Sequence, residues 1–138
     1  MTDDTYSVRT AGDLLRCGVV DIGSNTIRAV IYDVDVASRV FRETLNEKEH
    51  AELLGYIENG RLTDDGLEKL ISVLDHMKNV CFETQCERVF YFATAALRDI
   101  ANQSDVLFHV KAELGIDIDI IDGDEEARLD YLSLKEAT

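Results

Sequence analysis

One segment of this chain, residues 21–28 (DIGSNTIR), has the residue types best suited to chemistry. It lies between two apolar runs typical of β-strands, so its Gly-Ser-Asn-Thr corner predicts a tight hairpin. Backbone N–H groups at such a tip form a concave anion site, for which phosphate is the usual ligand. Asp21 would lie beside that anion, where a carboxylate makes sense mainly with a divalent cation between the two. An ordinary turn is the alternative, because Gly, Ser and Asn favour turns for backbone reasons alone.

Two other polar segments, residues 94–98 (TAALR) and residues 123–128 (GDEEAR), each follow an apolar run that is typical of a strand. Ligands of open α/β sheets bind at the carboxyl ends of the strands, where all three segments would lie. Phosphoryl transfer needs positioned donors, a cation and a group that aims the nucleophile, and these residue types suit it. Each segment alone is a weak signal.

The hydrophobic pattern predicts the elements that position these segments. Strands are expected at residues 15–22, 26–33, 40–45, 88–94 and 116–121. Helices are expected from the N-cap Thr63 to about Phe82, at residues 95–99, from Ser104 or Asp105 to Gly115, and from Asp124 onward. Residues 46–60 should form a partly helical connector. This order predicts an α/β fold with a mixed sheet: an antiparallel meander, then parallel strands joined by helices that cover at least one face.

The long helix should pack one apolar face on the sheet. The residues at helical spacing on that face are Leu67, Leu70, Ile71, Leu74, Met77 and Cys81. Met77 and Cys81 are therefore most simply core residues, and His76, which lies off the face, is expected in solvent. Residues 27–32 should be buried on both sides, because both alternating sets are fairly apolar.

Composition indicates one globular domain with an acidic surface. The 138 residues carry a net charge of −14, which argues against nucleic acid or an anionic membrane as a partner. No apolar stretch approaches the roughly 18–20 residues that cross a bilayer, and the acidic N-terminus does not resemble a signal peptide. We expect a cytoplasmic protein in which Cys17, Cys81 and Cys86 are reduced thiols. An anionic ligand would need positive charge from a bound cation or from protein outside this chain.

Together, the three polar segments resemble the N-terminal half of the exopolyphosphatase/guanosine pentaphosphate phosphohydrolase family (Ppx/GppA), over about residues 17–134. The resemblance implies a mixed five-stranded sheet, the ribonuclease H-like half of an actin-like ATPase fold, in which two related domains face each other across a cleft. Members of the family remove a terminal phosphate from polyphosphate or from guanosine pentaphosphate, using Mg²⁺ and water. Polyphosphate or guanosine pentaphosphate is thus the implied substrate, and Mg²⁺ the implied cofactor.

The resemblance also implies a role for each matched residue. Asp21 would lie near the metal ion, and Glu126 would orient and deprotonate the attacking water. The implied substrate-binding residues are Gly23, Ser24, Asn25, Thr26 and Arg98. A position one turn into a helix would keep Glu126 ionised, which favours orienting water over donating a proton. As simpler alternatives, Glu126 could be an acid at a helix start, Arg98 could pair with Asp99, and Thr94 could only cap a turn.

Two departures from the family pattern affect these expectations. Residues 47–62 are acidic where relatives often have a basic residue before Leu-Gly, so we expect no substrate contacts from them. Relatives also continue into a second domain that opens with another glycine-rich loop, which has no match here. We therefore divide the chain into a flexible tail (residues 1–13) and the N-terminal domain of such a phosphatase (residues 14–138). Alone it should be inactive, and its open cleft face should favour a homodimer.

Two other functions remain open at this point. The chain could be a non-catalytic module that binds phosphate or a nucleotide, or an actin-like kinase domain that transfers phosphate from ATP. The segments at 94–98 and 123–128 argue against the kinase, and a second glycine-rich loop further along the reading frame would argue against the module.

Overall fold

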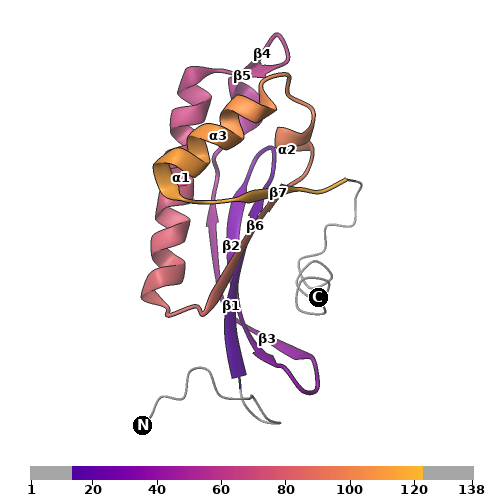
Figure 1. Cartoon of the computed structure of the whole chain (residues 1–138), viewed down its shortest axis with the longest axis vertical. Helices are drawn as coiled ribbons and strands as arrows, with labels where there is room; N and C mark the ends of the chain where they lie inside the picture. Colours follow the sequence, from indigo (N-terminus) through magenta and orange to yellow (C-terminus); the bar gives the residue numbers. More distant parts are fainter. Residues whose placement is uncertain (1–13, 123–138) are drawn as a thin grey trace.

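The computed structural model describes residues 14–122, and Figure 1 shows them as a twisted sheet with helices packed along one side. Five strands form the sheet in the order β3-β2-β1-β6-β7. They are β1 (Leu14–Ile22), β2 (Ile27–Asp35), β3 (Val40–Glu49), β6 (Arg88–Ala93) and β7 (Ile118–Ile120). β1 and β3 run antiparallel to β2, whereas β6 runs parallel to β1 and to β7. The mixed five-stranded sheet expected from the sequence is confirmed.

Three of the strands end together at one edge of the sheet. Ile22, the last residue of β1, is in register with Ala93, the last residue of β6. Ala93 is in turn in register with Ile120, the last residue of β7. The loop after β1 and the helix after β6 therefore leave the sheet side by side, as the carboxyl-end argument predicts.

The helices are α1 (Asp64–Glu83), α2 (Ala95–Arg98) and α3 (Gln103–Leu114). α1 begins as predicted at Thr63, whose hydroxyl accepts the Gly66 N–H at 3.1 Å. α3 ends as predicted at Gly115, which has a φ of 70°. None of the helices between residues 14 and 122 is both long and apolar enough to cross a membrane.

Both faces of the central strands are buried. The larger core joins one face of β1 and β2 to the helices, and α1 contributes Leu70, Val73, Leu74, Met77 and Cys81. The opposite face has a second apolar cluster, with Leu15, Cys17 and Val19 from β1, Val30, Tyr32 and Val34 from β2, and Phe92 from β6. The two-sided burial predicted for residues 27–32 is confirmed for their apolar members, and Cys81 is a core residue. All three cysteines are free thiols.

The predicted bounds were wrong mainly at the two edges of the sheet. β3 continues to Glu49 rather than Leu45, because cross-strand pairing with β2 overrides the weak strand propensity of its charged residues. β7 is shorter than the expected strand at 116–121, since only three residues pair with β6. The connector contains a 3₁₀ turn, η1 (Leu53–Tyr56), and a small hairpin of β4 (Ile57–Glu58) and β5 (Arg61–Leu62). His76 is half exposed, and its Nε2 lies 3.0 Å from Oε2 of Glu47. The helix expected from Asp124 lies outside the described residues.

Candidate functional site

The loop between β1 and β2 is a compact four-residue connection. The Gly23 N–H donates to the Thr26 carbonyl at 2.9 Å, which closes the loop directly above the last paired residues of the two strands. A Cβ on Gly23 would lie 3.0 Å from that same carbonyl oxygen, so glycine gives the closest approach. The hairpin predicted for residues 23–26 is therefore confirmed.

Two further hydrogen bonds fix the orientation of the loop. The Glu52 N–H donates to the Asn25 carbonyl at 2.8 Å, and the Leu54 N–H donates to the Ser24 carbonyl at 3.0 Å. In a trans peptide the carbonyl and the next N–H point in opposite directions. Since the two carbonyls face residues 52 and 54, the N–H groups of Asn25 and Thr26 point away from that segment.

These outward N–H groups are the donors that an anion site needs. Among residues 14–122, no acceptor takes up the amides of Ser24, Asn25 or Thr26. Oriented, unused amides at the end of a strand can bind a phosphate without any positively charged side chain. The structure therefore brings together the loop residues that the sequence singled out.

The segment that holds the loop was not anticipated. Glu52 has a φ of 53°, an uncommon left-handed conformation for a residue other than Gly or Asn. That conformation lies just before η1, where the N–H groups of Glu52 and Leu54 reach the loop. Strained backbone of this kind is concentrated at functional sites. No residue type in this polar stretch signals the contact, which depends on where β3 ends.

Asp21 lies on the sheet face opposite the one that α1 covers, because its neighbours Val20 and Ile22 belong to the core on the α1 side. Arg28 is its partner across β2, and Lys48 is the partner of Arg28 across β3. Cross-strand partners share a face, so these three residues form a row next to the loop, and the row continues through Phe92 of β6 to Asp119 of β7. The sequence analysis did not place Arg28 and Lys48 beside the loop. Counting back from the hairpin would have placed Arg28 opposite Asp21.

Arg98 ends α2 and is held from two sides. Its Nε donates to Oδ1 of Asp99, and its Nη1 donates to the Ile121 carbonyl, both at 3.4 Å. The pairing with Asp99 that was the simpler alternative is thus present. Both bonds are long, and the side chain is 29% exposed, so they cost little to exchange for a phosphate. Thr94 makes no side-chain cap to α2.

Glu126, the expected catalytic residue, lies outside the described residues with the rest of segment 123–128. The described part shows only how the chain approaches that segment. The Ile121 N–H donates to the Ala93 carbonyl at 2.8 Å, so residue 121 is at the edge where β6 ends. This places the chain leading into the third segment beside the second.

Residues 14–122 contain no cluster of three or more potential metal ligands. The carboxylate next to the loop amides on β1 is that of Asp21. Mg²⁺ suits such a site, because it is usually held by one or two carboxylates together with the phosphates of its substrate. The donor set fits a metal ion that arrives with its phosphate rather than one caged in advance.

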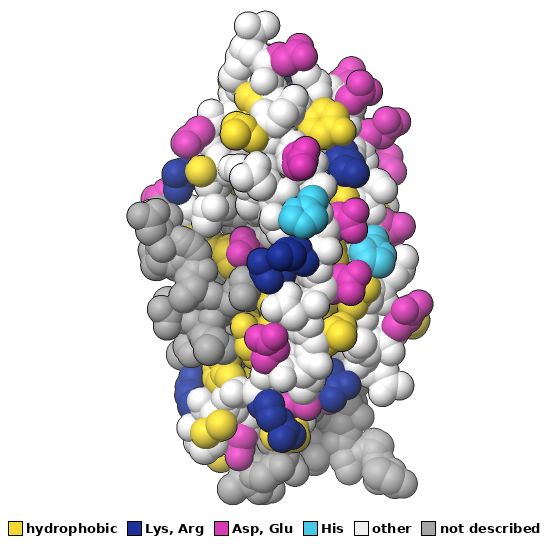
Figure 2. All heavy atoms as spheres, turned by 180° about the vertical axis from the view of Figure 1, so that it is seen from behind, with side chains coloured by type: hydrophobic (Ala, Val, Ile, Leu, Met, Phe, Trp, Pro, Cys, Tyr) yellow, Lys and Arg dark blue, Asp and Glu magenta, His cyan; other side chains and the backbone are white. Residues whose placement is uncertain are grey.

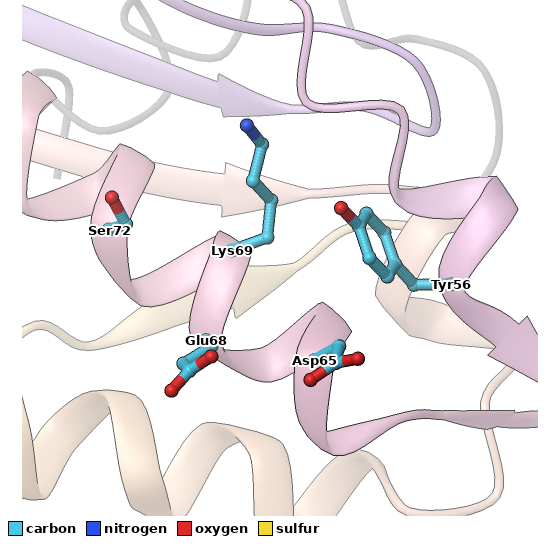
Figure 3. Close-up of a pocket in the computed structure, with 5 residues that line it drawn as sticks. All are labelled: Tyr56, Asp65, Glu68, Lys69 and Ser72. Carbon is cyan, nitrogen blue, oxygen red and sulfur yellow. The ribbon is translucent and has the colours of Figure 1, made fainter.

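A separate open depression of about 430 Å³ lies on the first half of α1, lined by Tyr56, Asp65, Glu68, Lys69 and Ser72. Figure 3 shows Lys69 extending from one side of α1, with Asp65 and Glu68 directed to another. Two carboxylates against one ammonium would repel a phosphate. This depression is therefore unsuited to a phosphate.

The surface as a whole is acidic. Figure 2 shows acidic side chains spread over the face behind that of Figure 1, with basic side chains only in small groups between them. With a net charge of −14, the field of this chain disfavours the approach of any polyanion. Near the loop, positive charge comes locally from Arg28 and Lys48.

Known proteins resemble this chain in both sequence and fold. Residues 30–138 match the Ppx/GppA phosphatase family. Exopolyphosphatase 1 of Mycobacterium tuberculosis is 31% identical over 126 residues, which are 88% of this chain and 35% of that protein. The chain thus spans about a third of the length of the curated exopolyphosphatases it matches.

Solved structures agree with this assignment. A Ppx/GppA family member from Aquifex aeolicus has a TM-score of 0.76 and 30% identity, over 90% of this chain and 40% of that one. An exopolyphosphatase from Cytophaga hutchinsonii has a TM-score of 0.71 and 31% identity, over 82% of this chain and 36% of that one. They confirm the expected fold class, an α/β fold with a mixed five-stranded sheet as in Ppx/GppA structures. This chain belongs to the Ppx/GppA phosphatase family.

Proposed function

We propose that residues 14–138 are the N-terminal domain of an exopolyphosphatase or guanosine pentaphosphate phosphohydrolase, and that the loop at 23–26 binds a phosphate of the substrate. One observation carries this proposal. The carbonyls of Ser24 and Asn25 are tied to residues 54 and 52, which leaves the N–H groups of Asn25 and Thr26 directed outward at the edge where β1 and β6 end.

The reaction we propose is hydrolysis of a terminal phosphoanhydride. Loop amides would hold a phosphate, while Arg28 of β2 and Arg98 at the end of α2 would offset its charge. Asp21 would hold Mg²⁺, which when bound supplies charge neutralisation for the phosphate oxygens. Glu126 would orient the attacking water and accept its proton.

The chain alone should bind phosphate but turn over poorly. It spans about a third of its curated relatives, and the expected second glycine-rich loop has no match in it. With one side of the cleft, a terminal phosphate lacks the donors that would stabilise the charge developing in the transition state. We propose that the open cleft face pairs with another domain, or with a second copy of the chain.

An NMR titration with tripolyphosphate, with and without Mg²⁺, tests the binding step. The amide resonances of Asn25 and Thr26 should shift most, and more with Mg²⁺ than without it. Ser38, in the turn between β2 and β3 at the opposite end of β2 from the loop, supplies an internal control that should not move. Shifts confined to other loops, or no shift at millimolar tripolyphosphate, would exclude this loop as the phosphate site.

Product analysis separates the hydrolase from its rivals. The protein encoded by the full reading frame should release inorganic phosphate from polyphosphate in the presence of Mg²⁺. A Glu126→Gln variant should lose most of that rate, while tripolyphosphate should still shift its loop amide resonances. A kinase would instead require ATP and an acceptor. A binding module would give the amide shifts with no turnover in any form of the protein.

A further inference from the structure

The C-terminal end of α1 brings two thiols together. Gln85 has a φ of 63°, and the N–H groups of Gln85 and Cys86 donate to the carbonyls of Phe82 and Cys81, both at 3.0 Å. This pair of bonds is the Schellman motif, in which the residues at its two ends make a side-chain contact across the helix terminus. Apolar side chains usually make that contact. Here the two residues are Cys81 and Cys86.

The strand beneath them shows how close the sulfur atoms lie. A Cβ placed on Gly18 of β1 would be 2.7 Å from Sγ of Cys81 and 3.3 Å from Sγ of Cys86. Both sulfur atoms are thus within 3.3 Å of a single point above β1, which places the two thiols next to each other. Cys81 is 1% exposed, whereas Cys86 is partly exposed, so a small reagent reaches Cys86 first.

The surroundings favour a thiolate at Cys86. The hydrogen bond from Cys81 lowers the pKa of Cys86, and the Thr84 hydroxyl, 3.7 Å from its sulfur, and the Arg16 guanidinium act in the same direction. Arg16 is held nearby, because its Nη1 donates to the Thr84 carbonyl at 3.1 Å. Burial raises the Cys86 pKa, and the Asp33 carboxylate opposes its ionisation more weakly.

Cys81 has the opposite tendency. Its hydrogen bond to Cys86 and its burial both raise its pKa, so Cys81 keeps its proton while Cys86 loses one. Tyr91 of β6, a further titratable group near the pair, stays neutral because burial raises its pKa. The thiol pair therefore has one nucleophile and one proton-bearing partner.

We propose that Cys86 and Cys81 are an oxidation site, at which a peroxide converts the two thiols into an intramolecular disulfide. The Cys86 thiolate attacks one oxygen of hydrogen peroxide: an S–O bond forms, the O–O bond breaks, and the departing hydroxide becomes water with the proton that Cys86 released. The Cys81 sulfur then attacks the sulfenic acid of Cys86. An S–S bond forms, the S–O bond breaks, and hydroxide leaves as water with the proton from Cys81. Two thiols thus give two electrons to one peroxide.

Cys17 serves as a reference within the same strand. It is fully buried in the cluster on the other face of the sheet, away from α1. A fully buried structural thiol is inert to reagents in solution. Oxidation should therefore spare Cys17, although it is next to Gly18 in the sequence.

Mass spectrometry of the 138-residue chain tests this inference. Treatment with one to ten equivalents of hydrogen peroxide should lower the mass by about 2 Da, and the change should reverse with dithiothreitol. Digestion without reduction should show Cys81 linked to Cys86, with Cys17 still available for alkylation after denaturation. An unchanged mass, a link to Cys17, or a gain of oxygen without a link would overturn the inference.

Two variants separate the roles of the two thiols. Cys81→Ala should accumulate the sulfenic acid, which dimedone traps on Cys86, whereas Cys86→Ala should give no dimedone adduct at Cys81. If either variant fails to fold, the native chain still decides the order of reactivity. Iodoacetamide should alkylate Cys86 first, with a midpoint below the ordinary cysteine value of about 8.5. Earlier alkylation of Cys81 or Cys17 would refute the assignment.

Discussion

The close approach of β1 to the end of α1 makes a strong prediction about Gly18. In Gly18→Ala, the new methyl group would lie 2.7 Å from Sγ of Cys81, a separation that real side chains do not adopt. Sγ of Cys86 at 3.3 Å and Cδ1 of Ile31 at 3.4 Å restrict it from other directions. Cys81 is fully buried, so its sulfur has no solvent space to move into. The substitution should therefore overpack the core.

Two effects set the size of the change. One extra methyl group in a well-packed core typically destabilises a protein by about 1–3 kcal/mol. Replacing Gly by Ala also removes freedom from the unfolded chain, which stabilises by about 0.4–1 kcal/mol. We expect a net loss of about 1–2 kcal/mol in the free energy of unfolding. In a Cys81→Ala background the sulfur is gone and the methyl group has room, so most of that loss should disappear.

Urea denaturation of the reduced protein, followed by circular dichroism, measures this double-mutant cycle. Gly55→Ala is the matched control, because nothing lies within 4 Å of a Cβ at that position. It should change the free energy of unfolding by less than about 0.5 kcal/mol. If Gly18→Ala were as stable as Gly55→Ala, or equally destabilising with and without the Cys81 sulfur, the contact described here would be wrong.

Three further predictions concern other contacts. Hydrogen bonds from Arg16 lower the pKa of Asp33, so this stabilisation is present above the unfolded-state pKa near about 3.9 and is lost as pH falls through the lower folded value. Asp33→Asn should thus reduce stability at pH 7 by about 1–3 kcal/mol and weaken its decline below about pH 4, as urea midpoints from pH 2 to 7 would show. Leu54→Pro removes the N–H that holds the Ser24 carbonyl and should weaken tripolyphosphate binding in calorimetry several-fold, whereas Leu54→Ala, which keeps the N–H, should not. Thr63→Ala should cost about 1 kcal/mol by loss of the N-cap, and Thr63→Ser much less; equal losses in urea titrations would contradict the cap.

Local sequence signals were sufficient to predict an element where a residue type at its end has a single structural role. Thr63 followed by two acids predicted the start of α1, and Gly115 predicted the end of α3, because caps satisfy groups within one turn. Both alternating sets of side chains in β2 are apolar, which predicted burial on both faces because successive side chains of a strand point to opposite faces. In β3 the charged residues conceal the strand, since this edge strand is mostly exposed and is held mainly by its hydrogen bonds to β2.

The sequence predicted the loop of the candidate site but not the backbone segment that holds it. The hairpin at 23–26 could be inferred from its turn residues, and its place beside α2 from the order of the strands. Its orientation could not, because it depends on two N–H groups beyond the end of β3, one of them next to a left-handed Glu52. Such a contact is a matter of where two backbones meet, and no side chain in the sequence encodes it.

The same distinction applies to the thiol pair. Cys81 and Cys86 lack the CxxC spacing, and the helical spacing of Cys81 assigned it to the core. A spacing of five residues becomes a contact only when a helix ends between them in a Schellman motif, which here requires a left-handed Gln85. Gly18 then matters because any larger residue in β1 would push the sulfur atoms away.

Three residues after Gly18, the same strand carries Asp21 to the loop. Because β1 is hydrogen-bonded to β2 and β6 along this stretch, we expect the structural change in Gly18→Ala to be confined to the core. NMR shifts of the loop amides in Gly18→Ala would instead show that β1 transmits the change to the loop.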